Sequence, residues 1–341
     1  MVFIEDLSIL IYLSIYIYIY TYIVIFINFN LKKIYNNNNS MSTTQKICLV
    51  TGASRGIGKG IALALCKAGH KVYITGRTKV ATKKSPVAMD TTAAEINKVS
   101  ISSGGQCIPI ICDHADDEST KNVFETIVKE NNGRLDILVN NAYAAVNALL
   151  ESNNQKFWEK DLSIWNASHN VGLRSHYVCS VYASKIMVPK QQGLIVNISS
   201  FGGLEYAWFA NDIAYGVGKA ALDRLGNDMA HELKKHNVCC VTLWPGTVRT
   251  ELVGNNPGFE NGETPEFSGR CVLAISENLN KIFPSRTGRI LLSTELAEEF
   301  DFTDVDGKIP NSHPNDLREQ MTTPPKHWVL SGGNKYISSK M

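Results

Sequence analysis

The chain has 341 residues, of which 44% are apolar and 19% charged, enough for a globular body with a substantial core. Its formal net charge of +2 excludes an extended nucleic-acid-binding surface, so we expect no nucleic-acid partner. The eight cysteines form no C-x-x-C pair and the eight histidines show no ligand spacing, which predicts reduced thiols and no metal site.

The amino terminus carries a mostly apolar run at residues 9–29, long enough to cross a bilayer. Lys32 and Lys33 follow it, which by the positive-inside rule leaves the rest of the chain on the cytoplasmic face of a membrane such as the endoplasmic reticulum. Its Ile/Tyr alternation is also typical of an AT-rich untranslated leader. Residues 1–45 are therefore either a membrane anchor with its linker or an artefactual leader, and in the second case the protein starts at Met41 and is cytosolic.

A short apolar segment at 46–50 predicts a buried strand, followed at once by the glycine-rich turn TGASRGIG and a helix at 59–68. This order presents backbone N–H groups at a helix N-terminus to a pyrophosphate. The spacing is G-x-x-x-G-x-G, which differs from the commoner G-x-G-x-x-G. The residues expected to bind a dinucleotide here are Gly52, Ser54, Arg55, Gly56, Ile57 and Gly58.

The second predicted strand, 72–75, leads into Arg77. An acidic residue at this place would hold the ribose 2′-OH of NAD(H), whereas an arginine suits the 2′-phosphate of NADP(H). Arg55 adds a second cation within the glycine turn. Unless both arginines are simply solvated, the pair favours NADP(H) over NAD(H).

The third predicted strand, 107–112, ends at Asp113, whose carboxylate either accepts from the adenine amino group or caps the helix that begins near Asp116. The fourth, 135–139, is followed by the segment NNAY, in which Asn140 is expected to contact the cofactor. Strands and helices alternate regularly, so the sequence predicts parallel βαβ units in one doubly wound, Rossmann-type α/β sheet.

The second half of the chain continues this alternation, with helices at 157–166, 171–187 and 215–235 and strands at 193–198, 238–243 and 289–293. Residues 251–268 are rich in Gly, Pro, Asn and Glu, which predicts a flexible loop. The folded domain is expected to span 46–300, with a turn-rich tail at 301–341.

Tyr215 and Lys219 stand four residues apart at the start of a predicted helix, so their side chains share one helix face. A lysine ammonium near a phenol stabilises the phenolate and lowers its pKa from about 10 towards neutrality. Any helix can carry this pair by chance. The serine-ended strand and the phosphate-binding turn upstream favour a tyrosine that acts as an acid or base.

These motifs together resemble those of the short-chain dehydrogenases/reductases, over residues 46 to about 295. They occur in the order of that family: TGASRGIG at 51–58, NNA at 140–142, Asn170, Ser200, YGVGK at 215–219 and PGTVRT at 245–250. Longer segments, among them NNAYAAV, NVGLRSHY and VTLWPGTVRTEL, are similar to one subgroup of the family.

The resemblance implies a hydride-transferring oxidoreductase, and the two arginines favour NADP(H) as its cofactor. Tyr215 would give a proton to a substrate carbonyl or take it back in reverse, and Lys219 would lower its pKa and bind the nicotinamide ribose. Ser200 would hold the substrate oxygen, and Asn170 would keep a water chain in place. The turn expected to cradle the nicotinamide amide consists of Pro245, Gly246, Thr247 and Val248.

The subgroup implies a lipophilic carbonyl substrate of steroid or xenobiotic type, and the family implies a homo-oligomer that pairs through the helices at 171–187 and 215–235. The alternative is a non-catalytic module that senses the dinucleotide. Such a module needs no proton donor, so it fits the complete set of Ser200, Tyr215, Lys219 and Asn170 less well.

Two departures from the family pattern bear on the pocket. Tyr143 stands where the family has glycine, so its side chain must either point away from the cofactor or line the pocket. The segment between Ser200 and Tyr215 is longer than usual and rich in aromatic residues, which either pack the loop or form an apolar wall, the alternative we favour: Phe201, Tyr206, Trp208 and Phe209.

Overall fold

A computed structural model describes residues 45–80, 88–204, 212–254 and 259–314, together with Leu317 and Met321. The amino-terminal run with Met41, the aromatic residues Tyr206, Trp208 and Phe209, and the tail beyond residue 321 lie outside the described residues. Within the described part of the chain, no helix has both the length and the apolar composition needed to span a bilayer.

Seven parallel strands form a single sheet in the order β3-β2-β1-β4-β5-β6-β7. Their bounds are β1 Ile47–Val50, β2 Lys71–Gly76, β3 Gln106–Ile111, β4 Ile137–Asn140, β5 Gly193–Ile198, β6 Val238–Trp244 and β7 Ile290–Leu292. From β1 to β3 the chain adds strands on one side of β1, and from β4 onward it adds them on the other side. A doubly wound sheet binds ligands at this switch point between β1 and β4, outside the carboxyl ends of the strands. The predicted fold class is confirmed.

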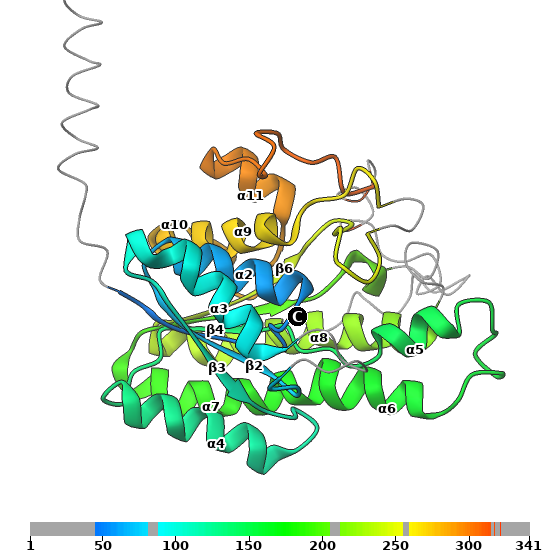
Figure 1. The fold of residues 1–341 in the computed structure, drawn as a ribbon, viewed down its shortest axis with the longest axis horizontal. Coiled ribbons are helices and arrows are strands. Elements are labelled where there is room, and N and C mark those ends of the chain that lie inside the picture. The colour runs from blue at the N-terminus through cyan, green and yellow to red at the C-terminus, as the bar shows by residue number, and fades with distance from the viewer. Residues whose placement is uncertain are drawn as a thin grey trace, which may run out of the picture. The chain divides into compact units, whose positions relative to one another are not determined.

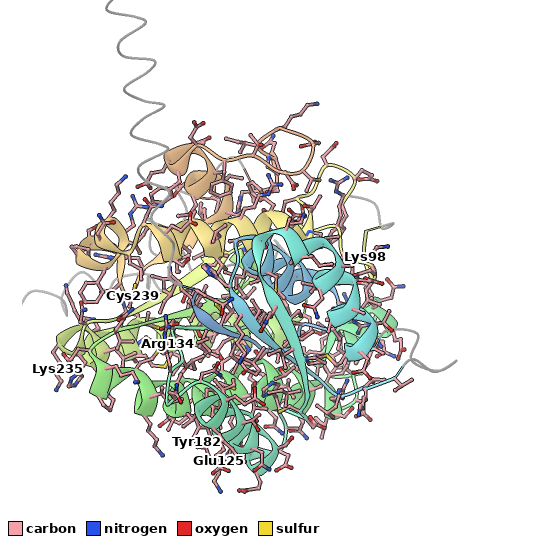
Figure 2. All side chains as sticks on the ribbon, turned by 60° about the vertical axis from the view of Figure 1, so that its left-hand side comes forward. Lys98, Glu125, Arg134, Tyr182, Lys235 and Cys239 are labelled. Carbon is pink, nitrogen blue, oxygen red and sulfur yellow. The ribbon has the colours of Figure 1, made fainter. Side chains whose placement is uncertain are left out.

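Helices cover both faces of the sheet, as Figure 1 shows. One layer consists of α2 Gly56–Lys67, α3 Met89–Ser100 and α9 Pro265–Glu277, and the other of α4 Asp117–Glu130, α7 Ser175–Lys190 and α8 Ile213–Leu233. Shorter elements are α5 Val146–Glu151, α6 Ser163–His169, the π-helical turn Asn170–Arg174, α10 Leu279–Arg286 and α11 Ser293–Phe300. Figure 2 shows Lys98, Glu125 and Lys235 at the outer surface, and all three are exposed.

Strand side chains alternate between two apolar cores, because successive residues of a strand point to opposite faces. Cys48 and Val50 belong to the core under α2, α3 and α9, whereas Leu49 and Tyr73 belong to the core under α4, α7 and α8. Both faces are therefore buried, which explains why the strands appear in the sequence as continuous apolar runs.

The loop predicted at 251–268 is wrong in its last four residues. Helix α9 begins at Pro265, and Phe267 is fully buried against the sheet. Proline is favoured at the first position of a helix, where its missing N–H is not needed. The predicted helix at 157–166 is also too long, because regular α-helix starts only at Ser163.

Candidate active site

The glycine-rich turn after β1 adopts a conformation that requires glycine. Gly52 and Gly56 have φ angles of +64° and +57°, and a Cβ on Gly52 would lie 2.6 Å from the Ala142 Cα atom. Asn141 holds the turn, because its Nδ2 donates to the carbonyl oxygens of Thr51 (2.9 Å) and Gly52 (3.0 Å). The sequence did not assign this bridging role to Asn141.

An open cleft lies beside this turn, at the carboxyl ends of the strands. It is lined by five residues that the sequence predicted for the dinucleotide, namely Gly52, Ser54, Arg55, Arg77 and Asp113. It is also lined by Cys112, His114 and Val171, which the sequence had not placed there, and by Tyr143, for which the sequence had left this open. Among the described residues, neither arginine has a carboxylate partner.

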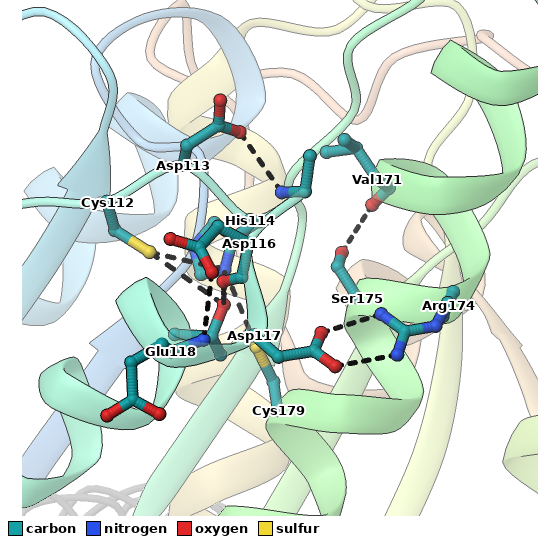
Figure 3. Close-up of polar contacts among 12 residues, drawn as sticks. Cys112, Asp113, His114, Asp116, Asp117, Glu118, Val171, Arg174, Ser175 and Cys179 are labelled. Atoms are coloured by element: carbon teal, nitrogen blue, oxygen red, sulfur yellow. Dashed lines mark hydrogen bonds and ion pairs between the residues drawn. The ribbon is translucent and has the colours of Figure 1, made fainter.

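Asp113 does not cap the following helix. Its Oδ1 accepts from the Ala115 N–H at 3.0 Å, while Asp116 is the residue that caps α4, accepting from the Glu118 N–H at 3.0 Å. Figure 3 shows both aspartates on the segment between β3 and α4. The capping alternative is wrong, and contact of Asp113 with an adenine stays a prediction.

His114 connects the glycine turn to the start of α4. The Thr120 hydroxyl donates its one hydrogen to the Asp116 carbonyl (3.1 Å), so it accepts from His114 Nδ1 (3.2 Å), which carries the ring hydrogen. His114 Nε2 then accepts from the Thr75 hydroxyl (2.7 Å), whose oxygen also accepts from the Gly52 N–H (3.1 Å). Burial lowers the pKa of His114 to about 4, which keeps the ring neutral for this chain of hydrogen bonds.

The N-terminus of α2 already accommodates an anionic oxygen. The Gly56 N–H donates to Glu251 Oε2 at 2.9 Å. A carboxylate oxygen at this place is chemically similar to a phosphate oxygen, and helix N-termini bind both. The turn and the two cleft arginines therefore fit the pyrophosphate of a dinucleotide.

Three of the four predicted catalytic residues lie together where β5 ends and α8 begins. Ser200 follows β5, accepts from the Gly202 N–H at 3.1 Å and hydrogen-bonds the Tyr215 phenol. Lys219 Nζ donates to the Ile198 carbonyl at 3.0 Å and lies 5.8 Å from the centroid of the Tyr215 ring. Ser199 instead donates to the Lys219 backbone carbonyl at 3.3 Å. Ser200 is thus the serine of the pair that contacts the tyrosine.

Burial dominates the ionisation of this cluster. It raises the pKa of Tyr215 to about 12, against the hydrogen bond from Ser200, which lowers it. It also lowers the pKa of Lys219 to about 8, against the carboxylate of Asp223, which raises it. The predicted lowering of the Tyr215 pKa is therefore wrong, because desolvation of the phenolate outweighs the hydrogen bond with Ser200, and the Asp223 carboxylate raises the pKa further.

Two predicted asparagines lie elsewhere. Asn140 is fully buried, and its Nδ2 donates to Asn197 Oδ1 and Ser180 Oγ, both at 2.9 Å, so it ties β4 to β5 and α7. Asn170 opens the π-helical turn with an exposed side chain, and its carbonyl accepts from the Ser175 N–H. Within the described part of the chain, the Asn170 side chain has no hydrogen bond to the other three predicted catalytic residues.

The two departures from the family pattern have different outcomes. Tyr143 lines the cleft, which is the second of the two orientations predicted for its side chain. Phe201 does not form a wall, because it packs in a buried cluster with Trp244, Leu292 and Leu317. The aromatic-wall prediction is therefore wrong for Phe201.

The predicted nicotinamide turn is held by residues far along the chain. The Gly246 N–H donates to Glu263 Oε1, which also accepts from Ser293 Oγ at 3.1 Å. The Thr247 N–H donates to the Ser312 carbonyl at 3.0 Å. Part of the predicted tail thus supports this turn, and the sequence gave no local signal for either contact.

Glu263 is expected to make the folded protein less stable as the pH rises. Burial raises its pKa from 4.5 to about 8, so between these values the unfolded chain releases a proton that the folded chain keeps. Glu263→Gln cannot ionise but keeps an oxygen for the Gly246 N–H. At pH 9 this variant should be more stable than the parent by about 1–3 kcal/mol, because it leaves no buried charge unpaired.

The check on Glu263 is urea unfolding of both proteins at pH 6 and pH 9. The stability difference between them should be clearly larger at pH 9 than at pH 6, because the folded-state carboxyl loses its proton only near pH 8. Equal gaps at the two values would contradict a titrating Glu263. Glu263→Ala, which removes the acceptor altogether, should be destabilised at both.

Known proteins that are similar to this chain belong to the family that its motifs resemble. Residues 46–260 match the sequence model of the family described as short chain dehydrogenase. The chain is 46% identical over 279 residues to Dehydrogenase/reductase SDR family member 1 of Mus musculus, covering 77% of this chain and 84% of that protein. It is 30% identical over 262 residues to Hydroxysteroid dehydrogenase-like protein 2 of Xenopus tropicalis, covering 75% and 58%.

Solved structures agree with the fold. A short chain dehydrogenase from Mycobacterium thermoresistibile is 27% identical, with a TM-score of 0.65, and the match covers 78% of this chain and 92% of that one. The subgroup indicated by NNAYAAV and VTLWPGTVRTEL is that of the mouse protein, so the narrower resemblance is confirmed as well.

Proposed function

The chain belongs to the short-chain dehydrogenase/reductase family, oxidoreductases that use a nicotinamide dinucleotide on small molecules, and from that premise we propose that it transfers hydride between NADP(H) and a lipophilic carbonyl or secondary alcohol. The observation that carries the proposal is the buried Tyr215 phenol, hydrogen-bonded to Ser200 and next to the Lys219 ammonium. These are a proton donor, a hydroxyl for the substrate oxygen and a positive charge in one place.

In the reductive direction, Tyr215 donates its phenolic proton to the carbonyl oxygen. Its raised pKa keeps the phenol protonated at neutral pH, which suits a donor. The Ser200 hydroxyl, held by the Gly202 N–H, stabilises negative charge as it develops on the same oxygen. The Lys219 ammonium offsets the charge left on the phenolate. A bound nicotinamide supplies the hydride.

The choice of NADP(H) rests on Arg55 and Arg77. Both line the cleft beside the glycine turn, and within the described residues no carboxylate neutralises either. Two guanidinium groups favour a phosphate over a hydroxyl on the ribose, because they donate charge-assisted hydrogen bonds. Asp113 would meet the adenine, and residues 245–248 would hold the nicotinamide amide.

A lipophilic substrate is supported by the aromatic and apolar side chains near the catalytic pair. Tyr143 packs edge-on against Tyr215, and Val171 lines the dinucleotide cleft together with Tyr143. The similarity to a protein named Hydroxysteroid dehydrogenase-like protein 2 supports a steroid-type carbonyl. Apolar walls contribute binding energy in proportion to the apolar area that the substrate buries.

The test is a screen of the full-length protein with NADPH against steroid ketones, aromatic ketones and quinones, with small polar ketones as the comparison. Oxidation of NADPH should depend on the carbonyl, and kcat/KM should rise with the apolar surface of the substrate. Turnover of the small polar ketones alone would contradict the proposed substrate class.

A further inference from the structure

Tyr143 occupies a fixed position beside the catalytic pair. A Cβ on Gly172 would lie 2.5 Å from Cδ2 of Tyr143, so the missing side chain at Gly172 makes room for the ring. At its other end, the Tyr143 hydroxyl shares a hydrogen bond with Ser168 Oγ at 3.0 Å. The π-helical turn and α6 therefore hold a side chain that the family's glycine does not have.

The Tyr143 ring and the Tyr215 ring stand at right angles around Lys219. Their centroids are 5.8 Å apart with an angle of 88° between the planes, an edge-to-face arrangement that aromatic pairs favour. Lys219 Nζ lies over the Tyr143 ring, 5.3 Å from its centroid, and 5.8 Å from that of Tyr215. Both distances fall within the roughly 6 Å over which a ring face attracts a cation.

The Lys219 ammonium has few other sources of stabilisation. Its residue is 8% exposed, and an ammonium carries three donors. Within the described part of the chain, one acceptor bonds to it, the Ile198 carbonyl. Burial accordingly lowers its pKa to about 8, close to the range in which the enzyme must keep this charge.

We propose that Tyr143 is a positioning residue that presents its ring face to the Lys219 ammonium and thereby keeps this side chain charged and in place beside Tyr215. The inference rests on the proposed function for its catalytic meaning. The interaction itself is a property of the protein without substrate, so it can be measured separately.

Three other titratable groups near Lys219 do not account for a change in its pKa when Tyr143 is replaced. Asp223, one turn further along α8, raises the pKa of Lys219, and burial brings its own pKa to about 7. His176 of α7 stays neutral in this range, because burial lowers its pKa to about 3. Tyr215 is neutral below about pH 12. All three side chains are still present when only Tyr143 is replaced.

The experiment compares Tyr143→Phe with Tyr143→Leu in the full-length protein. Both variants lose the hydroxyl and its bond to Ser168, so the difference between them isolates the aromatic face. The pKa of Lys219 is measured by NMR titration of the protein labelled with ¹³C at the lysine ε-carbon, and the resonance is identified by its loss in Lys219→Arg. Thermal unfolding of each variant establishes that it is folded.

We expect the pKa of Lys219 to be unchanged in Tyr143→Phe and to fall by about one pH unit in Tyr143→Leu, the equivalent of one desolvated cation–π contact. If Tyr143 only excludes water, Tyr143→Leu would admit water, relieve the desolvation of the ammonium and raise the pKa. A rise, or no change, in Tyr143→Leu would overturn the proposal.

A second measurement separates this inference from the proposed function. The alkaline limb of kcat/KM for carbonyl reduction should move to lower pH in Tyr143→Leu by the same amount as the NMR value. A fall in the NMR pKa in a protein that reduces no carbonyl would uphold the cation–π contact while the proposed function fails.

Discussion

Tyr215→Phe is expected to lower both kcat and kcat/KM for carbonyl reduction by about 10²- to 10⁴-fold, the usual contribution of a positioned general acid. The phenylalanine ring keeps the edge-to-face packing with Tyr143 but has no proton to give to the substrate oxygen. Equal losses in the two constants would indicate an interaction made only in the transition state. Steady-state kinetics with NADPH and the best ketone of the screen provide the measurement, and NADPH binding should be retained.

The neighbouring serines test the same mechanism, with Ser199→Ala as the matched control for Ser200→Ala. Ser200→Ala removes the hydroxyl that bonds the phenol and should cost about 10²- to 10³-fold in kcat, as the loss of one oxyanion donor does. Ser199→Ala removes a hydroxyl that donates to the Lys219 backbone and should cost far less. Unchanged turnover in Tyr215→Phe would contradict the mechanism and favour a module that senses the dinucleotide without acting on a carbonyl.

The parts of the fold that the sequence predicted are those with local signals. The strand at 193–198 was predicted with the bounds that the structure shows, because both of its faces are buried and its apolar run is continuous. The glycine turn and the Tyr215–Lys219 spacing are likewise contained within eight and five residues. Such features need no knowledge of what packs against them.

The parts that the sequence missed depend on contacts between distant segments. Glu263 lies in a stretch of loop-like composition, yet it is fully buried because the turn at Gly246 and the hydroxyl of Ser293 surround it. The pKa of Tyr215 was predicted in the wrong direction for the same reason. Spacing shows that a lysine is near, but only packing shows how completely both groups are removed from water.

Arg77→Ala is expected to weaken NADPH binding about 10- to 100-fold and to leave NADH binding nearly unchanged, because hydrogen bonds to a charged group contribute about 1.5–3 kcal/mol. Arg77 is exposed at the end of β2 and lines the cleft together with Arg55, so we expect both guanidinium groups at the 2′-phosphate. Arg55→Ala should act in the same direction, and the double variant should bind the two cofactors about equally. Fluorescence titration with NADPH and NADH measures all three.

Lys98→Ala separates the local role of Arg77 from the loss of one positive charge. Lys98 is exposed on α3, so its removal changes the net charge by the same amount (Figure 2). A contribution from net charge alone would weaken NADPH binding in both variants and would be screened by added salt. A selective loss in Arg77→Ala would place the 2′-phosphate at this guanidinium. Tighter binding of NADH than NADPH by the parent protein would refute the choice of NADP(H), because two arginines that bind a 2′-phosphate must favour the cofactor that carries one.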